Sequence, residues 1–380
     1  MKILNYKPQI DNTELKYLKK CIDTKWLSSS GPLVKKFENK VKKFTGSRYA
    51  VACSNGTTAL HLAIRLLNPS YGDEILLPSL SFIASANSII YNNCNPVFLD
   101  SDNNYNLDLT KLKIFLNKNT YLRNGFTYNK RTKKKILALM SVSVWGSSSN
   151  LFELKKILKG KNIHLIEDAA EGLGSYCVSN RKKKHLGTFG ILGCISFNLN
   201  KIITTGGGGI ILTNNKRLAL KAKYLSLQAK DNPSKWIHNE VGYNFGLSNL
   251  HASIGLAQFL KLGKIIKNKK KIFKYYLEGI KNNKNYEIFS PPKYITPNYW
   301  MNILVVKNKK INLKKLHDKF ISRNIEVKFV WFPCHLQKQF KKYQNFNISN
   351  SLKLVRNSLL LPSSSNLSKK EIDNLLKDLK

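Results

Sequence analysis

Short apolar runs alternate with helix-like segments from about residue 45 to residue 215, and this alternation constrains the fold more than any other feature. Between the first two runs, Leu60, Ala63, Ile64 and Leu67 recur at helical spacing. Strands that alternate with helices favour an α/β fold with a mostly parallel sheet covered on both faces. The expected strands cover residues 49–53, 74–77, 96–99, 135–140, 163–166, 195–197 and 209–212. Ligands bind such sheets at the carboxyl ends of the strands, so the residues that follow each strand are candidates for a site.

The pattern changes near Leu250, where long basic amphipathic helices begin, followed by short strands such as residues 301–306. We therefore expect three parts. An N-terminal arm covers residues 1–30, a large ligand-binding domain covers residues 31–250, and a smaller α/β domain covers residues 251–380.

The formal net charge of +42 suggests a polyanionic partner. However, only eight of the 64 basic residues are arginines, which leaves 56 lysines. Proteins that bind nucleic acid rely on arginine for bidentate contacts. Because the chain is also rich in Asn and Ile, drift of the genome toward A and T explains the bias better, and we disfavour a nucleic-acid partner. A basic nucleic-acid-binding or surface-binding protein on a retired enzyme fold remains an alternative.

The six cysteines are scattered without a Cys-x-x-Cys pair, which favours reduced thiols in the cytoplasm over disulfides or a metal site. No stretch approaches the roughly 20 apolar residues of a membrane helix. The first residues also lack the apolar core of a signal peptide. We therefore expect a cytoplasmic protein with no membrane contact and no bound metal.

Two segments that follow strands each allow two interpretations. After Cys53, a turn of small residues leads into a helix near Thr57, which suits either a bound phosphate or an ordinary N-cap threonine. Glu167 and Asp168 end another apolar run. A buried carboxylate needs a cationic partner, for example a protonated pyridine nitrogen, but Asp before Ala-Ala is also a common helix start.

A third segment is more specific, because Lys201 lies between an apolar run and the glycines 206–209. Glycines let the backbone pass close to a bulky group, and a lysine amine held in such a site can form a Schiff base with an aldehyde. The order of residues required for a phosphate-binding P-loop is absent, and so is the spaced-glycine dinucleotide fingerprint.

Taken together, residues 12–365 resemble the DegT/StrS-type family of pyridoxal-phosphate (PLP)-dependent nucleotide-sugar aminotransferases. The segments that carry this resemblance are 54–57, 167–171, 196–201, 204–206 and 242–244. The family implies a fold like that of aspartate aminotransferase. Within the family, the chain is most similar to the branch acting at C4 of nucleotide-linked 4-keto-6-deoxy sugars, of the legionaminic acid, bacillosamine or perosamine type. Segments 21–29, 228–230, 236–244 and 299–302 carry this closer similarity.

The resemblance implies a role for each matching residue around the PLP ring. Lys201 bonds to PLP and later moves the proton between cofactor and substrate. Asp168 keeps the pyridine nitrogen protonated, and Phe82 stacks on the ring. Glu171 stands where the family has Gln or Glu near the phenolic oxygen.

The resemblance also implies that the phosphate of PLP is bound by Gly56, Thr57 and Ser196. Asn244 reaches that phosphate from the partner subunit, so the resemblance implies a homodimer with its sites at the interface. L-Glutamate is the expected amino donor, and the product is an amino sugar for a bacterial surface polysaccharide or glycan.

Three positions depart from the family pattern. Ser143 replaces a histidine, Gly246 replaces an arginine, and Leu199 replaces a small residue. The first two indicate either a changed substrate or an eroded pocket, and a catalytically weak or regulatory protein remains an alternative. The dehydratase branch of the family has histidine at the position of Lys201, which disfavours dehydration here.

Overall fold

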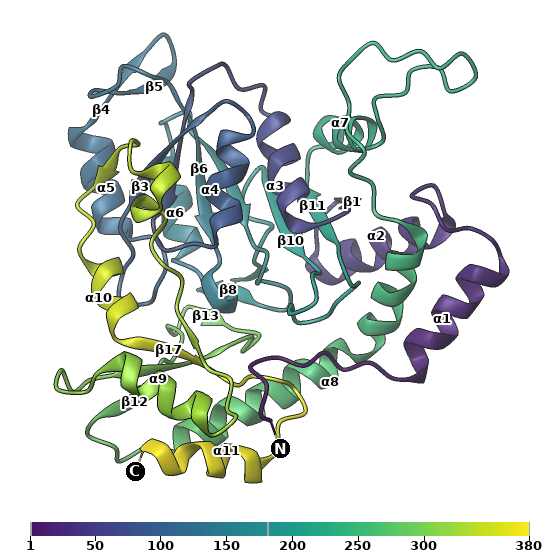
Figure 1. Cartoon of the computed structure of the whole chain (residues 1–380). Helices are drawn as coiled ribbons and strands as arrows, with labels where there is room; N and C mark the ends of the chain where they lie inside the picture. Colours follow the sequence, from purple (N-terminus) through teal and green to yellow (C-terminus); the bar gives the residue numbers. More distant parts are fainter. Residues whose placement is uncertain (1, 181, 380) are drawn as a thin grey trace.

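An eight-stranded sheet forms the centre of the larger lobe in the computed structural model, which describes residues 2–180 and 182–379 (Figure 1). Its strand order is β1-β11-β10-β7-β6-β2-β3-β16, and only β11 runs against the others. The strands are β1 (Tyr49–Cys53), β2 (Glu74–Pro78), β3 (Asn95–Leu99), β6 (Ile136–Val142), β7 (His164–Asp168), β10 (Leu192–Ser196), β11 (Gly209–Thr213) and β16 (Asn345–Phe346). This architecture confirms the predicted α/β class and the mostly parallel sheet.

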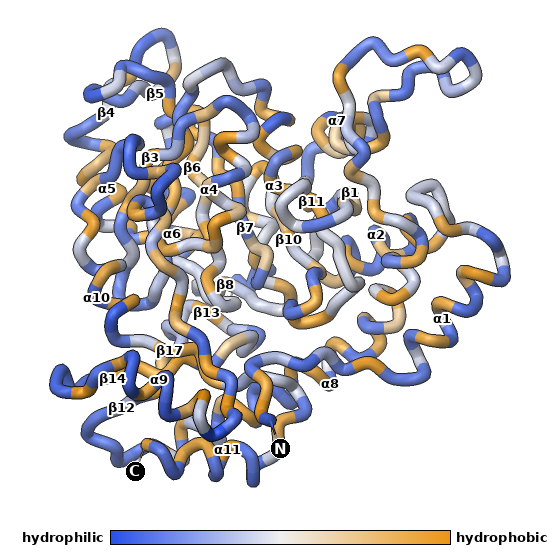
Figure 2. Tube along the Cα trace, in the orientation of Figure 1, coloured by the Kyte–Doolittle hydropathy of each residue, from blue (hydrophilic) through white to orange (hydrophobic). Residues whose placement is uncertain are grey.

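Helices cover both faces of this sheet, which explains why its strands are nearly continuous apolar runs. In β2, Leu76 packs into one core cluster while Ile75 and Leu77 pack into another on the opposite face. Helices α2 (Pro32–Thr45), α5 (Leu109–Lys118) and α6 (Leu151–Leu158) contribute to the first cluster. Helices α3 (Gly56–Arg65), α4 (Ile83–Ile90) and α7 (Lys216–Ser226) contribute to the second. Figure 2 shows the apolar residues gathered along these inner elements.

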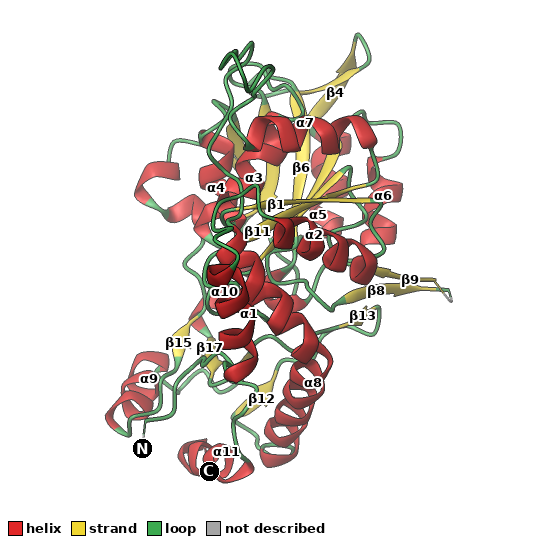
Figure 3. Cartoon of the chain, turned by 90° about the vertical axis from the view of Figure 1, so that its right-hand side faces the viewer, coloured by secondary structure: helices red, strands yellow, loops and turns green. Residues whose placement is uncertain are grey.

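The smaller lobe contains a four-stranded antiparallel sheet with a third core cluster. Its strands are β12 (Tyr286–Ile288), β14 (Asn302–Val306), β15 (Lys328–Phe329) and β17 (Ser358–Leu361), and its helices are α9 (Leu313–Ser322) and α11 (Lys369–Leu376). Helix α8 (Asn249–Gly279) runs from the larger lobe into the smaller one (Figures 1 and 3). The chain then returns to the large sheet at β16, so residues 345–346 of that sheet lie beyond the proposed boundary near residue 250.

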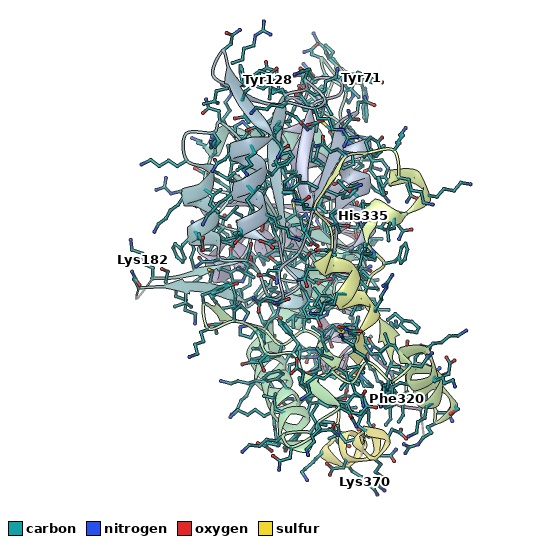
Figure 4. The ribbon with its side chains drawn as sticks, turned by 90° about the vertical axis from the view of Figure 1, so that its left-hand side faces the viewer. Tyr71, Tyr128, Lys182, Phe320, His335 and Lys370 are labelled. Atoms are coloured by element: carbon teal, nitrogen blue, oxygen red, sulfur yellow. The ribbon has the colours of Figure 1, made fainter. Side chains whose placement is uncertain are left out.

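The remaining elements lie around these two lobes. Strands β8 (Tyr176–Ser179) and β9 (Lys182–His185) project as a hairpin with Lys182 at its far end, and β13 (Ile295–Thr296) pairs with β8 (Figure 4). A second hairpin joins β4 (Thr120–Arg123) and β5 (Phe126–Asn129), and helix α1 (Asn12–Asp23) packs on α8. The other helices are α10 (Asn350–Arg356), η1 (Val144–Gly146), η2 (Cys334–Leu336), η3 (Lys338–Phe340) and η4 (Lys377–Leu379). Within the described ranges, every helix is too short or too polar to cross a membrane.

Asp100 holds the returning C-terminal segment against the large sheet. Its buried carboxylate accepts hydrogen bonds from the backbone N–H groups of Ser349, Asn350 and Ser351 and from the Lys111 ammonium. Burial alone would raise the pKa of this carboxyl, but these donors outweigh it and hold the pKa well below its usual range.

We expect Asp100→Asn to lower the free energy of unfolding at pH 7 by about 3 kcal/mol, because the carboxylate is lost while its donors remain. Since the folded pKa is depressed, this stabilisation is complete above the unfolded pKa of about 3.9 and disappears as the pH falls below it. Denaturant unfolding at several pH values measures the difference. Glu153→Gln, in an exposed pair with Lys113, is the control and should change stability by less than about 1 kcal/mol. Equal effects of the two substitutions would contradict the prediction.

Candidate active site

A cavity of about 170 Å³ opens at the carboxyl ends of β6, β7 and β10 and at the start of α3. Seven of the eight predicted site residues line it: Gly56, Thr57, Phe82, Asp168, Glu171, Ser196 and Lys201. The eighth, Asn244, is exposed and lies outside the cavity wall. A larger surface hollow of about 610 Å³, lined by residues such as Lys113 and Phe152, contains none of the predicted residues. We therefore place the site in the smaller cavity.

The start of α3 forms one end of the cavity. Asn55, and not Thr57, is the N-cap, because its side chain accepts the Thr58 N–H at 2.8 Å. The interpretation of Thr57 as an N-cap is therefore wrong. Helix geometry leaves the N–H groups of Gly56 and Thr57 without intrahelical acceptors, so this end of the helix favours an anion. A Cβ at Gly56 would lie only 2.9 Å from the Cβ of Ser196, so glycine keeps the two segments in contact.

Asp168 ends β7 and points into the cavity, where only 4% of the residue is exposed. Its Oδ2 accepts the Ser85 hydroxyl at 2.6 Å, and its Oδ1 accepts the Ala170 N–H at 3.1 Å. The chain then makes turns and no helix, so the alternative of a helix N-cap is wrong. Burial raises the pKa of Asp168, although the Ser85 hydroxyl, the Ala170 N–H and the Lys201 charge oppose that rise. A carboxylate in this environment favours a cationic partner.

Glu167, the neighbour of Asp168, points to the other face of the sheet. Its carboxylate accepts the backbone N–H groups of Gly187, Phe189 and Gly190 at 2.7, 2.5 and 2.7 Å. Successive side chains of a strand alternate between faces, so only one of the two acids can reach the cavity. Glu167 therefore has a structural role.

Lys201 and Glu171 form an ion pair inside the cavity, with 3.0 Å between Nζ and Oε1. The other carboxylate oxygen of Glu171 accepts the Trp145 N–H at 2.7 Å. Burial raises the pKa of Glu171 to about 7, even though the Lys201 ammonium and the Trp145 N–H lower it. This carboxyl can therefore gain and lose a proton near neutral pH, next to an amine.

Aromatic side chains that the sequence did not mark as site residues complete the walls. The Trp300 ring lies 4.4 Å from the Lys201 Nζ, within cation–π range. Phe82 is 53% exposed at the mouth, and its ring centre lies 5.9 Å from that of Trp331. Trp300 lies in segment 299–302, which carries the similarity to the family branch, and nothing local in the sequence singles out Trp331 or Ser85.

The glycine run serves a different purpose from the one expected. Its residues lie outside the cavity wall, and a Cβ at Gly209 would lie 2.3 Å from the carbonyl oxygen of Asn55. The group that Gly209 approaches closely is therefore part of the chain itself, namely the turn that precedes α3.

Among the positions that depart from the family, Ser143 lines the cavity and Gly246 does not. A Cβ at Gly246 would lie 2.8 Å from the Cβ of Ser29, so a larger residue there would displace this segment.

Comparison with known proteins agrees with this geometry. The sequence pattern of the DegT/DnrJ/EryC1/StrS aminotransferase family matches residues 8–380. GDP-perosamine synthase of Escherichia coli O157:H7 is 32% identical over 368 residues, which cover 97% of this chain and 94% of that protein. UDP-4-amino-4,6-dideoxy-N-acetyl-beta-L-altrosamine transaminase of Campylobacter jejuni is 30% identical over 277 residues, covering 72% of this chain and 68% of that protein. The structure of PseC, an aminotransferase of Helicobacter pylori, has the same fold, with a TM-score of 0.88 and 22% identity over 100% of this chain and 98% of that one.

Proposed function

Because the chain belongs to the DegT/DnrJ/EryC1/StrS aminotransferase family, whose members depend on PLP, we propose that it transfers an amino group to C4 of a nucleotide-linked 4-keto-6-deoxy sugar. The observation that carries the proposal is the convergence of Lys201, Asp168 and the start of α3 in one cavity. The name of the Campylobacter jejuni relative supports a 4-amino-sugar product carried by UDP, and the name of the Escherichia coli relative supports a product carried by GDP. We propose L-glutamate as the donor, which leaves as 2-oxoglutarate.

The residues of the cavity fit PLP. The start of α3, where a Cβ at Gly56 would collide with Ser196, suits the phosphate together with the hydroxyls of Thr57 and Ser196. The buried carboxylate of Asp168 suits the protonated ring nitrogen, and Phe82 offers an aromatic face. When bound, PLP supplies the aldehyde that accepts nitrogen and the ring that withdraws electrons.

We propose a distinct role for each residue around the position of PLP. Lys201 would be the covalent anchor for PLP and would move the proton between the cofactor and the substrate carbons. Asp168, fixed by Ser85, keeps the ring nitrogen protonated. Glu171 lies within hydrogen-bond distance of Lys201 and can exchange a proton with it, and on the family resemblance we propose that it would lie near the phenolic oxygen of the ring.

We also propose a cytoplasmic homodimer in which Asn244 reaches the phosphate of the partner's site. Two features support this arrangement. Asn244 is exposed and outside the cavity of its own chain, and the loop before it extends away from the body (Figure 1). That loop exposes Trp236 at 73% and Val241 at 74%, and burying such large apolar side chains against a second copy is favourable.

The amino sugar is proposed to enter a bacterial surface polysaccharide or another glycan. Ser143, a small residue in the wall, leaves room where the family has histidine, which favours a change of substrate over loss of the site. The intact arrangement of Lys201, Glu171 and Asp168 argues against a catalytically weak protein or a retired enzyme that binds nucleic acid.

The test is transfer of labelled nitrogen. The protein is loaded with PLP and given ¹⁵N-glutamate with a GDP-linked or a UDP-linked 4-keto-6-deoxy sugar, and mass spectrometry follows the nucleotide sugar. We expect ¹⁵N in the sugar and one equivalent of 2-oxoglutarate for each amino sugar formed. Reactions without glutamate are the control. Absence of label with both nucleotides, in protein that forms 2-oxoglutarate from glutamate, would refute the sugar substrate and leave the aminotransferase chemistry standing.

A further inference from the structure

A turn at the entry to β14 contacts both partners of the Lys201–Glu171 pair. The Asn298 side chain donates to the backbone carbonyl of Glu171 at 2.7 Å. The Trp300 indole N–H donates to the backbone carbonyl of Asn200 at 2.6 Å, while its ring faces the Lys201 ammonium at 4.4 Å. One short turn therefore touches the segments that carry both charged groups.

The backbone of this turn is held in an uncommon conformation. Tyr299 has a φ of +55°, which non-glycine residues seldom adopt. The Asn298 side chain also accepts the Trp300 N–H at 3.0 Å, which closes the turn. Because surrounding contacts must maintain such a conformation, the orientation of Trp300 depends on its neighbours.

Lys269 supplies the main contact on the other side of the turn. Its side chain, on α8, donates to the carbonyl of Trp300 at 2.9 Å and to the carbonyl of Ser363 at 2.6 Å. Only 2% of the residue is exposed, and in the described part of the chain no carboxylate pairs with it. Burial lowers its pKa to about 7, and either protonation state has enough N–H groups for both carbonyls. Burying a lysine costs free energy, and the contacts of Lys269 explain its burial, because they hold the turn in place.

We infer that Lys269 and Trp300 are positioning residues: Lys269 fixes the turn, and Trp300 holds Lys201 in register with Glu171 for bonding to PLP. The inference rests on the proposed role of Lys201. It couples the smaller lobe to the cavity, because the turn enters β14 of that lobe while Lys201 follows β10 of the large sheet. Tyr6 adds a further contact, since its hydroxyl donates to the Lys201 carbonyl at 2.6 Å.

A double-mutant cycle on PLP binding tests the inference. Lys269→Met, Trp300→Phe and the double variant are prepared free of PLP, and their affinity for PLP and the absorption maximum of the bound cofactor are measured. Each single change should weaken PLP binding about tenfold, because Lys269→Met removes the two buried hydrogen bonds that fix the turn and Trp300→Phe removes the indole hydrogen bond to the residue before Lys201. In the Trp300→Phe background, Lys269→Met should add less than about threefold, because Lys269 acts through the tryptophan. Both single variants should shift the absorption maximum in the same direction.

Lys270→Met is the matched control, because Lys270 is the exposed neighbour of Lys269 on α8 and should leave affinity and spectrum unchanged. Fully additive losses, or wild-type affinity in both single variants, overturn the inference while the proposed function stands. If wild-type protein does not bond PLP through Lys201, the proposed function fails and the inference fails with it. Should Lys269→Met not fold, Trp300→Phe alone decides, through its PLP affinity and the rate at which an amine reagent labels Lys201 in PLP-free protein. Wild-type values for both would overturn the inference.

Discussion

Lys201→Ala will reduce amino transfer by about 10³-fold or more, because it removes both the amine that bonds to PLP and the group that moves the proton. The fold should survive. Only 13% of the Lys201 side chain is exposed, and its loss leaves the buried Glu171 carboxyl without its ammonium partner. Since the pKa of Glu171 is already about 7, that carboxyl takes up a proton and avoids an unpaired buried charge.

The measurements are the initial rate of 2-oxoglutarate formation and the thermal unfolding midpoint. Borohydride reduction followed by peptide mass spectrometry should locate PLP on Lys201 in the wild type and nowhere in the variant. Lys182→Ala is the control, because Lys182 lies at the far end of the β8–β9 hairpin and is exposed (Figure 4). Full activity in Lys201→Ala, or PLP trapped on a different lysine of the wild type, would contradict the assignment.

Seven of the eight strands of the large sheet were predictable for a physical reason, whereas the two-residue β16 was not predicted. A strand covered on both faces must be apolar at successive positions, so β2 and β6 are visible as runs in the sequence. The hairpin β8–β9 was not predicted, because β9 reads Lys182-Lys183-Lys184-His185 and resembles a solvated charge run. Its strand conformation depends on pairing with β8, which no local pattern reveals.

The site residues also divide into those that a local sequence pattern reveals and those that depend on contacts with distant parts of the chain. The role of Ser196 came from the family resemblance, whereas the segments that carry Thr57, Asp168 and Lys201 were found because the carboxyl ends of parallel strands meet at one edge of the sheet. Ser85, Trp331 and Lys269 were not, because each reaches its partner from a distant part of the chain. Lys269, for example, bonds the carbonyls of residues 31 and 94 positions away. One lysine among 56 carries no signal until the fold shows which one is buried.

Asp168 and Glu167 allow a direct comparison, because two adjacent acids of one strand have different expected effects. Asp168→Asn should lower kcat by about 10²-fold or more, since a neutral amide cannot hold a proton on the cofactor's ring nitrogen through charge. The free energy of unfolding of Asp168→Asn should differ little from that of the wild type. The amide has nearly the same shape, its oxygen can keep the Ala170 N–H while its NH₂ group donates to the Ser85 hydroxyl, and burial already disfavours the charged carboxylate.

Glu167→Gln should show the opposite pattern. One of the two carboxylate oxygens becomes an NH₂ group that cannot accept, so at least one of the three converging N–H groups loses its acceptor, which should cost about 2 kcal/mol of folding free energy. Activity per folded molecule should stay near that of the wild type, because Glu167 faces away from the cavity. Thermal unfolding and kcat, measured on both variants at a temperature where each is folded, separate the two effects. Loss of kcat in Glu167→Gln with full kcat in Asp168→Asn would mean that the strand presents the other acid to the cofactor, and the proposed arrangement of the ring would have to be abandoned.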